Sequence, residues 1–424
     1  MFYASGPVRG ISFGGLWRHP EFVKLWAGQT ISLFGSEISQ LAIPLTAALV
    51  LNASPAQMGL LAAFEFAPFL LLSLLAGVWV DRLPRRPILI VADIGRALLL
   101  GSIPLAAIAG ALRIEQLYLV GILTGALTVF FDVADQSYLP VLVSREHLVE
   151  GNSKLEMSRS VAQITGPGVA GVLVQLFTAP LAVAVDAASF LASVLFLLFI
   201  RAPEPPPVRH ADAPNSIWGE LREGLAVVLG NPLLRSIAGC TGTSNLFSNA
   251  MFAVYVLYLT RELNIPPALL GLILAAAGPG ALLGALIAGR VAARFGLGTT
   301  IIASSLIGAT ANLLVPLASG PIVVIAGMLM LSQLISGTTN PVYNINQVSL
   351  RQAITPDRVQ GRMNASMRFL VWGTIPIGAL LGGGLGEAFG LRPTLLAMAA
   401  CGLLAPLWIA FSPVRALRVQ PASA

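Results

Sequence analysis

The sequence has 424 residues, of which 56% are hydrophobic and only 10% are charged, and its mean hydropathy is +0.82. About a quarter of the residues of an ordinary soluble domain are charged, so this composition excludes a soluble protein and indicates an integral membrane protein. The net charge of +6 comes from basic residues in short loops. Such loops set the orientation of a chain in the membrane, so we expect no nucleic-acid partner.

The cysteine and histidine content excludes several kinds of site. Cys240 and Cys401 both lie inside apolar runs, so neither a disulfide framework nor a thiolate metal cluster is expected. The three histidines fall in polar segments, so proton transfer within the membrane would depend on carboxylates. We therefore expect no metal and no cofactor.

Apolar stretches of membrane-spanning length recur along the whole chain. A spanning helix needs about 20 such residues, and charged or Pro/Gly-rich breaks divide the sequence into twelve stretches of this size. The first stretch follows a polar segment and is longer than the apolar core of a signal peptide, so we expect it to stay as a span. The predicted spans are 22–50, 57–80, 87–111, 116–141, 158–178, 181–200, 234–260, 268–293, 298–319, 321–348, 363–388 and 392–411.

The charge of the loops predicts the orientation. Loops on the side of residues 81–86 carry an excess of arginine and lysine, whereas the opposite loops carry balanced pairs or no charge. Because positively charged loops stay in the cytoplasm, we expect both termini to be cytoplasmic.

The longest polar break divides the spans into two sets of six. Residues 201–232 contain a Pro-rich stretch followed by an amphipathic segment, which is typical of a linker. Two short segments of the first set align with the second set at nearly the same offset, Gly77 with Gly289 at a shift of 212 residues and Gln136 with Gln347 at a shift of 211, so we expect a parallel repeat. The expected fold is an all-α membrane protein with an N-terminal half at 1–200, a cytoplasmic linker at 201–232 and a C-terminal half at 233–424.

The loop after the second predicted span is unusually charged, because residues 77–89 read GVWVDRLPRRPIL. Orientation explains the arginines but not the aspartate. The order of residues resembles the loop motif of the major facilitator superfamily, which implies a transporter whose two halves rock around a central site. The residues that match the motif are Gly77, Asp81, Arg82, Arg85 and Arg86.

The resemblance implies a gate at the cytoplasmic side. The motif's aspartate, Asp81, is expected to bridge to the start of span 11 while that side is closed, because a helix N-terminus attracts negative charge. The alternative is that Asp81 is an ordinary solvated charge in a loop. Asp93 and Arg96 lie three residues apart on one helix face, where they can pair, and we interpret them as part of the same gate.

Span 5 contains a second motif, since TGPGVAGVL at 165–173 resembles the G-P-x-x-G-G pattern of proton-coupled exporters through Gly166, Pro167 and Gly171. Small residues let helices approach closely, and ordinary packing is an equal alternative. The wider pattern resembles bacterial exporters related to the enterobactin and macrolide efflux proteins, which implies efflux. Span 4 lacks the membrane arginine that many drug/proton antiporters of the superfamily carry.

Two glutamates lie within predicted spans. Glu65 has no basic neighbour in its own span, and Glu37 lies near a polar stripe of span 1. Ionisable groups inside a membrane usually face a cavity or a partner, so both are candidate proton carriers. A structural hydrogen bond between helices is the alternative for each.

Polar residues line one face of spans 4 and 10, which are equivalent in the expected repeat. Two such faces suggest an aqueous cavity, which a polar segment of span 7 would complete. The candidate residues are Asp132, Asp135 and Gln136 in span 4, Asn340, Tyr343 and Asn344 in span 10, and Asn245 in span 7.

The expected function is secondary transport. The sequence has no GxxxxGK[ST] motif and no Ser/His or metal constellation, so we expect neither an ATPase nor an enzyme. The main hypothesis is the export of a small amphipathic molecule, such as a drug, siderophore or natural product, in exchange for protons. An uptake symporter and a non-transporting signalling or assembly protein remain as alternatives. The expected setting is a monomer in the bilayer of the bacterial cytoplasmic (inner) membrane.

Overall fold

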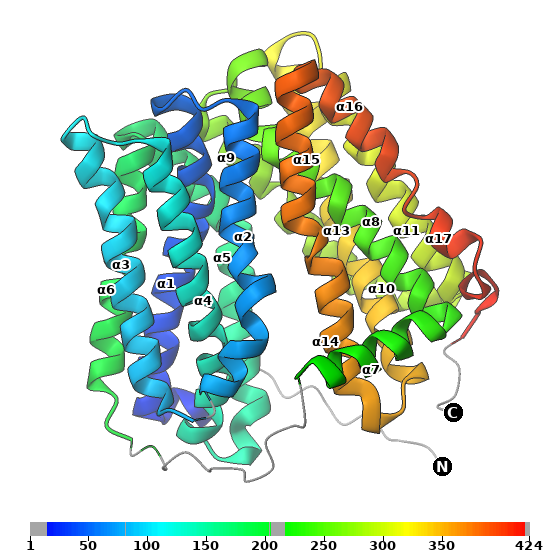
Figure 1. Cartoon of the computed structure of the whole chain (residues 1–424), viewed down its shortest axis with the longest axis horizontal. Helices are drawn as coiled ribbons and strands as arrows, with labels where there is room; N and C mark the ends of the chain where they lie inside the picture. The colour runs from blue at the N-terminus through cyan, green and yellow to red at the C-terminus, as the bar shows by residue number, and fades with distance from the viewer. Residues whose placement is uncertain (1–14, 81, 203, 205–216, 420–424) are drawn as a thin grey trace.

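The protein is described here by a computed structural model that covers residues 15–80, 82–202, 204 and 217–419. The described residues form helices and no strand. Figure 1 shows two helical bundles whose ribbons converge at the top of the view and separate toward the bottom. We name these two sides of the molecule the closed end and the open end.

The first bundle, the N-half, consists of the elements before residue 200. Inside it α1 packs on α5 and α6, α3 packs on α4 and α6, and α2 packs on α4. The elements are η1 (Gly15–Arg18), α1 (Pro20–Leu45), η2 (Thr46–Val50), α2 (Pro55–Val80), α3 (Arg85–Ile108), α4 (Ile114–Leu142), η3 (Arg145–His147), α5 (Leu148–Phe177) and α6 (Ala179–Phe199).

The second bundle, the C-half, follows after α7 (Ile217–Gly230). Inside it α8 packs on α15 and α16, while α10 and α11 pack on α13. The elements are α8 (Pro232–Leu257), η4 (Tyr258–Glu262), α9 (Pro267–Ala275), α10 (Ala277–Phe295), α11 (Leu297–Asn312), α12 (Leu314–Leu317), α13 (Ile322–Ile354), α14 (Asp357–Trp372), α15 (Thr374–Phe389), α16 (Leu391–Gly402), α17 (Leu407–Ala410) and η5 (Pro413–Ala416).

The twelve predicted spans correspond one to one to helices or to consecutive helix pairs. Among the described residues, eleven helices are long and apolar enough to cross a membrane, and the bent pair of α7 and α8 brings the number to twelve. The boundary at the start of span 5 was wrong, because α5 begins at Leu148 and not at 158. Its first turns carry several charges, so the helix extends beyond its apolar part.

The expected repeat is confirmed by backbone details that recur at equivalent positions of the alignment pairing Gly77 with Gly289, which we name the repeat alignment. Spans 1 and 7 both end in a π-helical turn, η2 and η4. Each turn is followed by an asparagine in the left-handed region, Asn52 with φ 50° and Asn264 with φ 51°. Two equivalent spans therefore end in the same local geometry.

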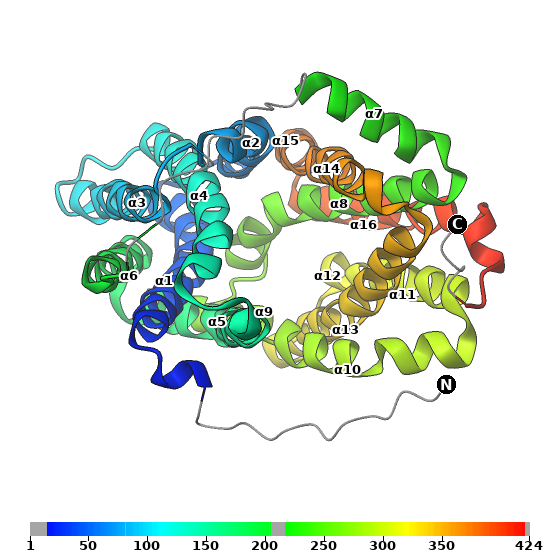
Figure 2. The same ribbon diagram turned by 90° about the horizontal axis from the view of Figure 1, so that it is seen from below.

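The two halves meet at the closed end through two helix crossings, α2 on α15 and α5 on α9 (Figure 2). At each crossing two glycines lie face to face. A Cβ added to Gly59 would lie 2.8 Å from Cα of Gly383, and one added to Gly171 would lie 2.9 Å from Cα of Gly271. The repeat alignment relates Gly59 to Gly271 and Gly171 to Gly383. Helices associate in a bilayer mainly through close packing, which glycine permits.

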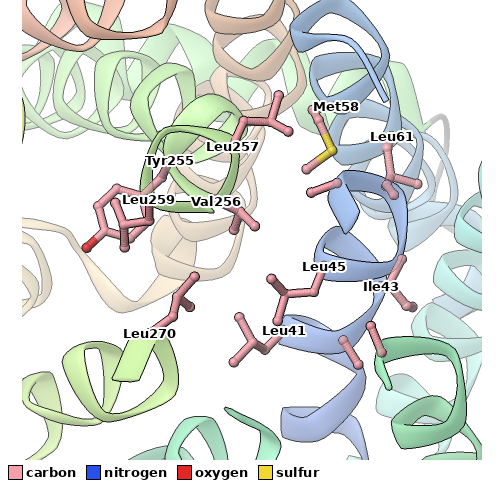
Figure 3. Packing of buried hydrophobic residues seen from close by; sticks show 14 of the residues in the cluster. Leu41, Ile43, Leu45, Met58, Leu61, Tyr255, Val256, Leu257, Leu259 and Leu270 are labelled. Atoms are coloured by element: carbon pink, nitrogen blue, oxygen red, sulfur yellow. The ribbon is translucent and has the colours of Figure 1, made fainter. Parts of the chain in front are cut away.

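Apolar side chains from both halves pack around these crossings. The buried cluster includes residues of α1 and α2 together with residues of α8, η4 and α9. Figure 3 shows Leu257 of α8 facing Met58 of α2, and Leu41 of α1 lying opposite Leu270 of α9. The closed end is therefore a continuous packed layer.

Helix α7 lies at the open end of the C-half, along its outer edge beside α14 and α8 (Figures 1 and 2). The segment Arg222–Gly230 makes an angle of 101° with Pro232–Glu262. It packs on α14, where Arg362 Nη1 lies 2.8 Å from both carboxylate oxygens of Glu223. An amphipathic helix at such an angle is typical of the membrane interface.

Candidate functional site

The N-half contains a cavity of about 300 Å³, which we name the N-half cavity. Most of its wall is apolar, and three charged side chains, Glu65, Arg96 and Asp186, contribute to it. Because few polar groups stand in an apolar wall, the cavity has the character of a small-molecule site. Aromatic residues in the lining are Phe66, Phe69, Phe190 and, from the C-half, Phe252.

Glu65 reaches this cavity from α2, as its isolation in the sequence suggested. Two glycines of α4 make room for the turn of α2 that carries Glu65. A Cβ at Gly121 would lie 3.1 Å from Cγ of Glu65, and a Cβ at Gly125 would lie 2.7 Å from the Glu65 carbonyl oxygen. The sequence G-x-x-x-G in span 4 therefore lets α4 pack closely against the turn of α2 that carries Glu65.

Arg96 is a buried cation in α3. Its Nη2 donates to Oδ1 of Asp93, which confirms the pairing expected from their spacing. Its guanidinium carbon lies 4.2 Å from the ring centres of both Phe131 and Phe190, an arrangement that stabilises a desolvated cation.

This pair lies away from the ends of α3. Arg96 lies eleven residues, or about 16 Å, into a helix that begins at Arg85. Its side chain lines the N-half cavity. The pair thus belongs to the wall of a central cavity, and its role in a gate stays a prediction.

Asp186 was not among the candidate residues, although it lines the same cavity from α6. It is 1% exposed, and Ser189 Oγ donates to its Oδ1 at 3.2 Å. Gly35 of α1 makes room for it, since a Cβ there would lie 2.5 Å from the carboxylate. The signal in the sequence is a lone aspartate in an apolar span.

A second set of polar residues lies along α4, between the N-half cavity and the open end. Gln29 Nε2 of α1 donates to Oδ1 of Asp135. Asp132 is exposed and lies within electrostatic reach of Arg159 of α5 and of Arg368 of α14. Charges of the two halves therefore lie within electrostatic reach of each other here. Gln136 is exposed and lines neither of the two cavities described here.

The C-half contains a second cavity of about 300 Å³, which we name the C-half cavity. Asn340 and Tyr343 of α13 line it, and the Tyr343 hydroxyl lies 2.7 Å from Thr241 Oγ1. Asn344 lies beside the cavity and donates to Asn340 Oδ1 at 2.6 Å. Asn245 points elsewhere, since its Nδ2 donates to the Val371 carbonyl at 3.3 Å.

The span 5 motif packs against two other helices. A Cβ at Gly166 would lie 2.4 Å from Cβ of Glu37, so this glycine seats the turn of α1 that carries the predicted proton carrier. Glu37 is not in the lining of either cavity. Gly171 forms one of the closed-end crossings, where the carbonyl oxygen of Pro167 would lie 2.3 Å from a Cβ at Gly271.

Two arginines of the loop motif contact residues at and just after the end of α6. The backbone N–H groups of Arg85 and Arg86 donate to Glu204 at 2.6 and 3.2 Å, which caps the start of α3. Arg86 Nε also donates to the carbonyl of Leu197 at 2.9 Å. Gly77 lies in α2 and Arg82 is exposed. Asp81 lies outside the described residues, so its bridging role stays a prediction.

Polar contacts also join the halves at the closed end. Glu387 Oε2 of α15 accepts a hydrogen bond at 3.2 Å from the backbone N–H of Ala56, in the first turn of α2. Arg261 Nη2 of η4 donates at 3.1 Å to the carbonyl of Ala48 in η2. A carboxylate at a helix N-terminus is favourable, so Glu387 stabilises the closed arrangement of this end.

Comparison with known proteins gives consistent matches over the whole chain. The family described as transmembrane secretion effector matches residues 13–422. The multidrug efflux pump Tap of Mycolicibacterium fortuitum is 27% identical over 411 residues, which are 93% of this chain and 96% of that protein. Macrolide efflux protein A of Streptococcus pyogenes is 27% identical over 236 residues, covering 55% of this chain and 58% of that protein.

Solved structures share the same fold. A bacterial homologue of the iron transporter ferroportin, in its inward-facing state, superposes with a TM-score of 0.73 at 18% identity. The match covers 94% of this chain and 99% of that chain. In the described ranges of the present chain, no group of three or more His, Cys, Asp or Glu side chains could hold a metal ion.

Proposed function

Because the chain belongs to the transmembrane secretion effector family of major facilitator superfamily transporters, we propose that it exports a small amphipathic molecule in exchange for protons. Membership of this family means that the chain is a multi-pass secondary transporter and not an enzyme. Its efflux-pump relatives support the direction of transport. The proposed substrate class is drugs, siderophores or natural products with an apolar body and a basic group.

The observation that carries this proposal is the composition of the N-half cavity. Asp93 neutralises Arg96, so Glu65 and Asp186 are the remaining charged groups in an apolar and aromatic wall. Such carboxyl groups are held at least cost either as neutral acids or beside a bound cation. A proton and a basic substrate would therefore compete for the same two groups, which is the requirement for exchange.

The proposed direction also depends on the orientation of the chain. Arginine-rich loops predict that the open end faces the cytoplasm, in the inner membrane of a bacterium. The arrangement with a packed closed end would then be inward-facing and ready to take substrate from the cytoplasm. We assign residues 1–200 and 233–424 to the two moving halves, 201–232 to the linker, and a monomer to the working unit.

Transport in everted membrane vesicles tests the proposal, with ethidium as the probe. An inside-acidic proton gradient should drive ethidium into the vesicles, and a protonophore should release it. Glu65→Gln should remove the response to the gradient, because glutamine cannot exchange a proton. Glu115→Gln is the matched control, since this exposed glutamate lies at the start of α4 and outside both cavities.

The alternatives predict different results in the same assay. An uptake symporter would accumulate the probe in right-side-out vesicles and not in everted ones. A non-transporting signalling or assembly protein would give no flux in either preparation. Gradient-driven ethidium uptake that Glu65→Gln leaves unchanged would refute the role of the N-half cavity in coupling.

A further inference from the structure

A short stretch of α2 contributes a carboxyl group and two aromatic rings to the N-half cavity. Glu65, Phe66 and Phe69 all line this cavity. The ring centres of Phe66 and Phe69 lie 6.4 Å apart, and the ring planes make an angle of 41°. Because aromatic faces attract both cations and other rings, this part of the wall favours a cation that carries a flat aromatic ring system.

The Phe69 ring contacts an aromatic residue of the other half. Trp372 is the last residue of α14, and the centres of the two rings lie 6.5 Å apart with their planes at 67°. Such an edge-to-face arrangement is one of the favourable geometries of an aromatic pair. Trp372 lines neither cavity, so it can act on a bound molecule only through Phe69.

The position of Trp372 is fixed by its surroundings. The guanidinium carbon of Arg368, one turn earlier in α14, lies 4.7 Å from the centre of the Trp372 ring, which is a favourable cation–π contact. The next residue, Gly373, lies close to α2, because a Cβ added there would be 3.5 Å from Cδ1 of Leu70. The end of α14 therefore lies directly beside the turn of α2 that carries Phe69.

The fold does not require aromatic rings at these two positions. In the repeat alignment, Phe69 corresponds to Ala281 and Trp372 corresponds to Ser160. The equivalent helices, α10 and α5, therefore meet without an aromatic residue at either position. An aromatic pair on one side only indicates a role that belongs to the N-half cavity, which Phe69 lines.

We propose that Trp372 is a positioning residue that fixes the orientation of the Phe69 ring and thereby makes the N-half cavity selective for cations with an extended flat ring system. The carboxyl group of Glu65 neutralises the charge of such a molecule, and Phe66 and Phe69 contact its rings. This assignment rests on the proposed export function, because it narrows the class of substrate for the same cavity.

Binding to purified protein in lipid nanodiscs tests this role with two monovalent cations, measured by isothermal titration calorimetry. Ethidium has an extended flat ring system, whereas tetraphenylphosphonium carries four separate phenyl rings around its charge. Trp372→Leu should weaken ethidium binding about three- to tenfold, the size expected for the loss of one aromatic pair. The affinity for tetraphenylphosphonium should stay within about twofold, and Trp372→Phe, which keeps a ring, should recover most of the ethidium affinity.

A double-mutant cycle shows whether Trp372 acts through Phe69. Phe69→Leu should weaken ethidium binding by at least as much as Trp372→Leu, and the two changes together should weaken it no more than Phe69→Leu alone. Phe64→Leu is the matched control, because Phe64 forms an edge-to-face pair with Tyr118, at 5.5 Å and 71°, but lines neither cavity. This variant should keep the ethidium affinity of the wild-type protein.

The outcomes separate the two proposals. An equal loss for both cations in Trp372→Leu, an unchanged ethidium affinity, or losses that add in the double variant would overturn the positioning role even if ethidium is exported. Transport in everted vesicles reports separately on export, and flat-ring selectivity without any proton-driven transport would overturn the export function alone. Failure of the wild-type protein to bind ethidium would overturn both.

Discussion

Substituting Gly383 by alanine should push the two halves apart at the closed end. The new Cβ would lie 2.7 Å from the Pro55 carbonyl oxygen and 2.8 Å from Cα of Gly59. Both obstacles are backbone atoms, so no rotamer change relieves the clash and the helices themselves must separate. Overpacking of this kind costs about 1–3 kcal/mol.

This cost applies to one conformation only. When α2 and α15 part at the closed end, the alanine has room and the penalty disappears. A differential free energy of about 1–3 kcal/mol shifts a two-state equilibrium by about 5- to 150-fold. We therefore expect Gly383→Ala to populate a conformation in which the closed end opens.

Spin labels at Asn52 and Ala388, in a background without Cys240 and Cys401, measure the width of this end. Both label sites are exposed and belong to different halves. Gly383→Ala should add longer distances to the distribution. Gly384→Ala is the matched control in the same helix, because a Cβ there meets nothing within 4 Å. Identical distributions for the two variants would refute the reasoning.

The remaining substitutions test the charges of the N-half cavity. Glu65→Gln should make ethidium export independent of pH, measured as flux across a series of external pH values; an unchanged profile would return Glu65 to a structural role. Arg96→Gln should destabilise the protein by about 3–5 kcal/mol, because it leaves the buried carboxylate of Asp93 unpaired. Thermal unfolding in nanodiscs measures this loss, and Asp93→Asn added to Arg96→Gln should recover much of it.

The spans and the repeat could be predicted from the sequence because they depend on local composition. Apolar runs of membrane-spanning length mark the helices. The repeat alignment already relates P-x-x-x-G at Pro55–Gly59 to the same pattern at Pro267–Gly271. That match marks both closed-end crossings. A short sequence identity does not by itself show which helices pack against each other, so its structural role is known only from the contacts between the halves.

The cavity could be predicted only in part, because depth in the membrane and contacts between helices are not local properties. Glu65 stood out as an unpaired charge. Asp186 is equally isolated in its span, but its contact with the cavity depends on how α6 packs against its neighbours. The pairing of Arg96 with Asp93 follows from their spacing, whereas the place of Arg96 in the cavity wall does not. The contribution of Phe252 could not be predicted at all, since it enters the N-half cavity from the other half of the chain.

Helix α2 links the two ends of the molecule through its two termini. At the closed end, Glu387 accepts a hydrogen bond from the first turn of α2. Asp81 directly follows the other end of α2, where the motif predicts a contact that holds the opposite conformation. One helix would thus carry opposing carboxylate contacts, each favouring a different state of the transporter.

This arrangement predicts effects of opposite sign for two charge-removing substitutions. Glu387→Gln weakens the contact at the closed end and should lengthen the distance between labels at Asn52 and Ala388. Asp81→Asn removes the opposing contact and should increase the population of the short distance. Because both changes replace a carboxylate by an amide of the same size, neither creates a cavity or a clash. If the two variants shift the distribution in the same direction, α2 does not balance two opposing contacts, and the charged loop after it serves only to orient the chain.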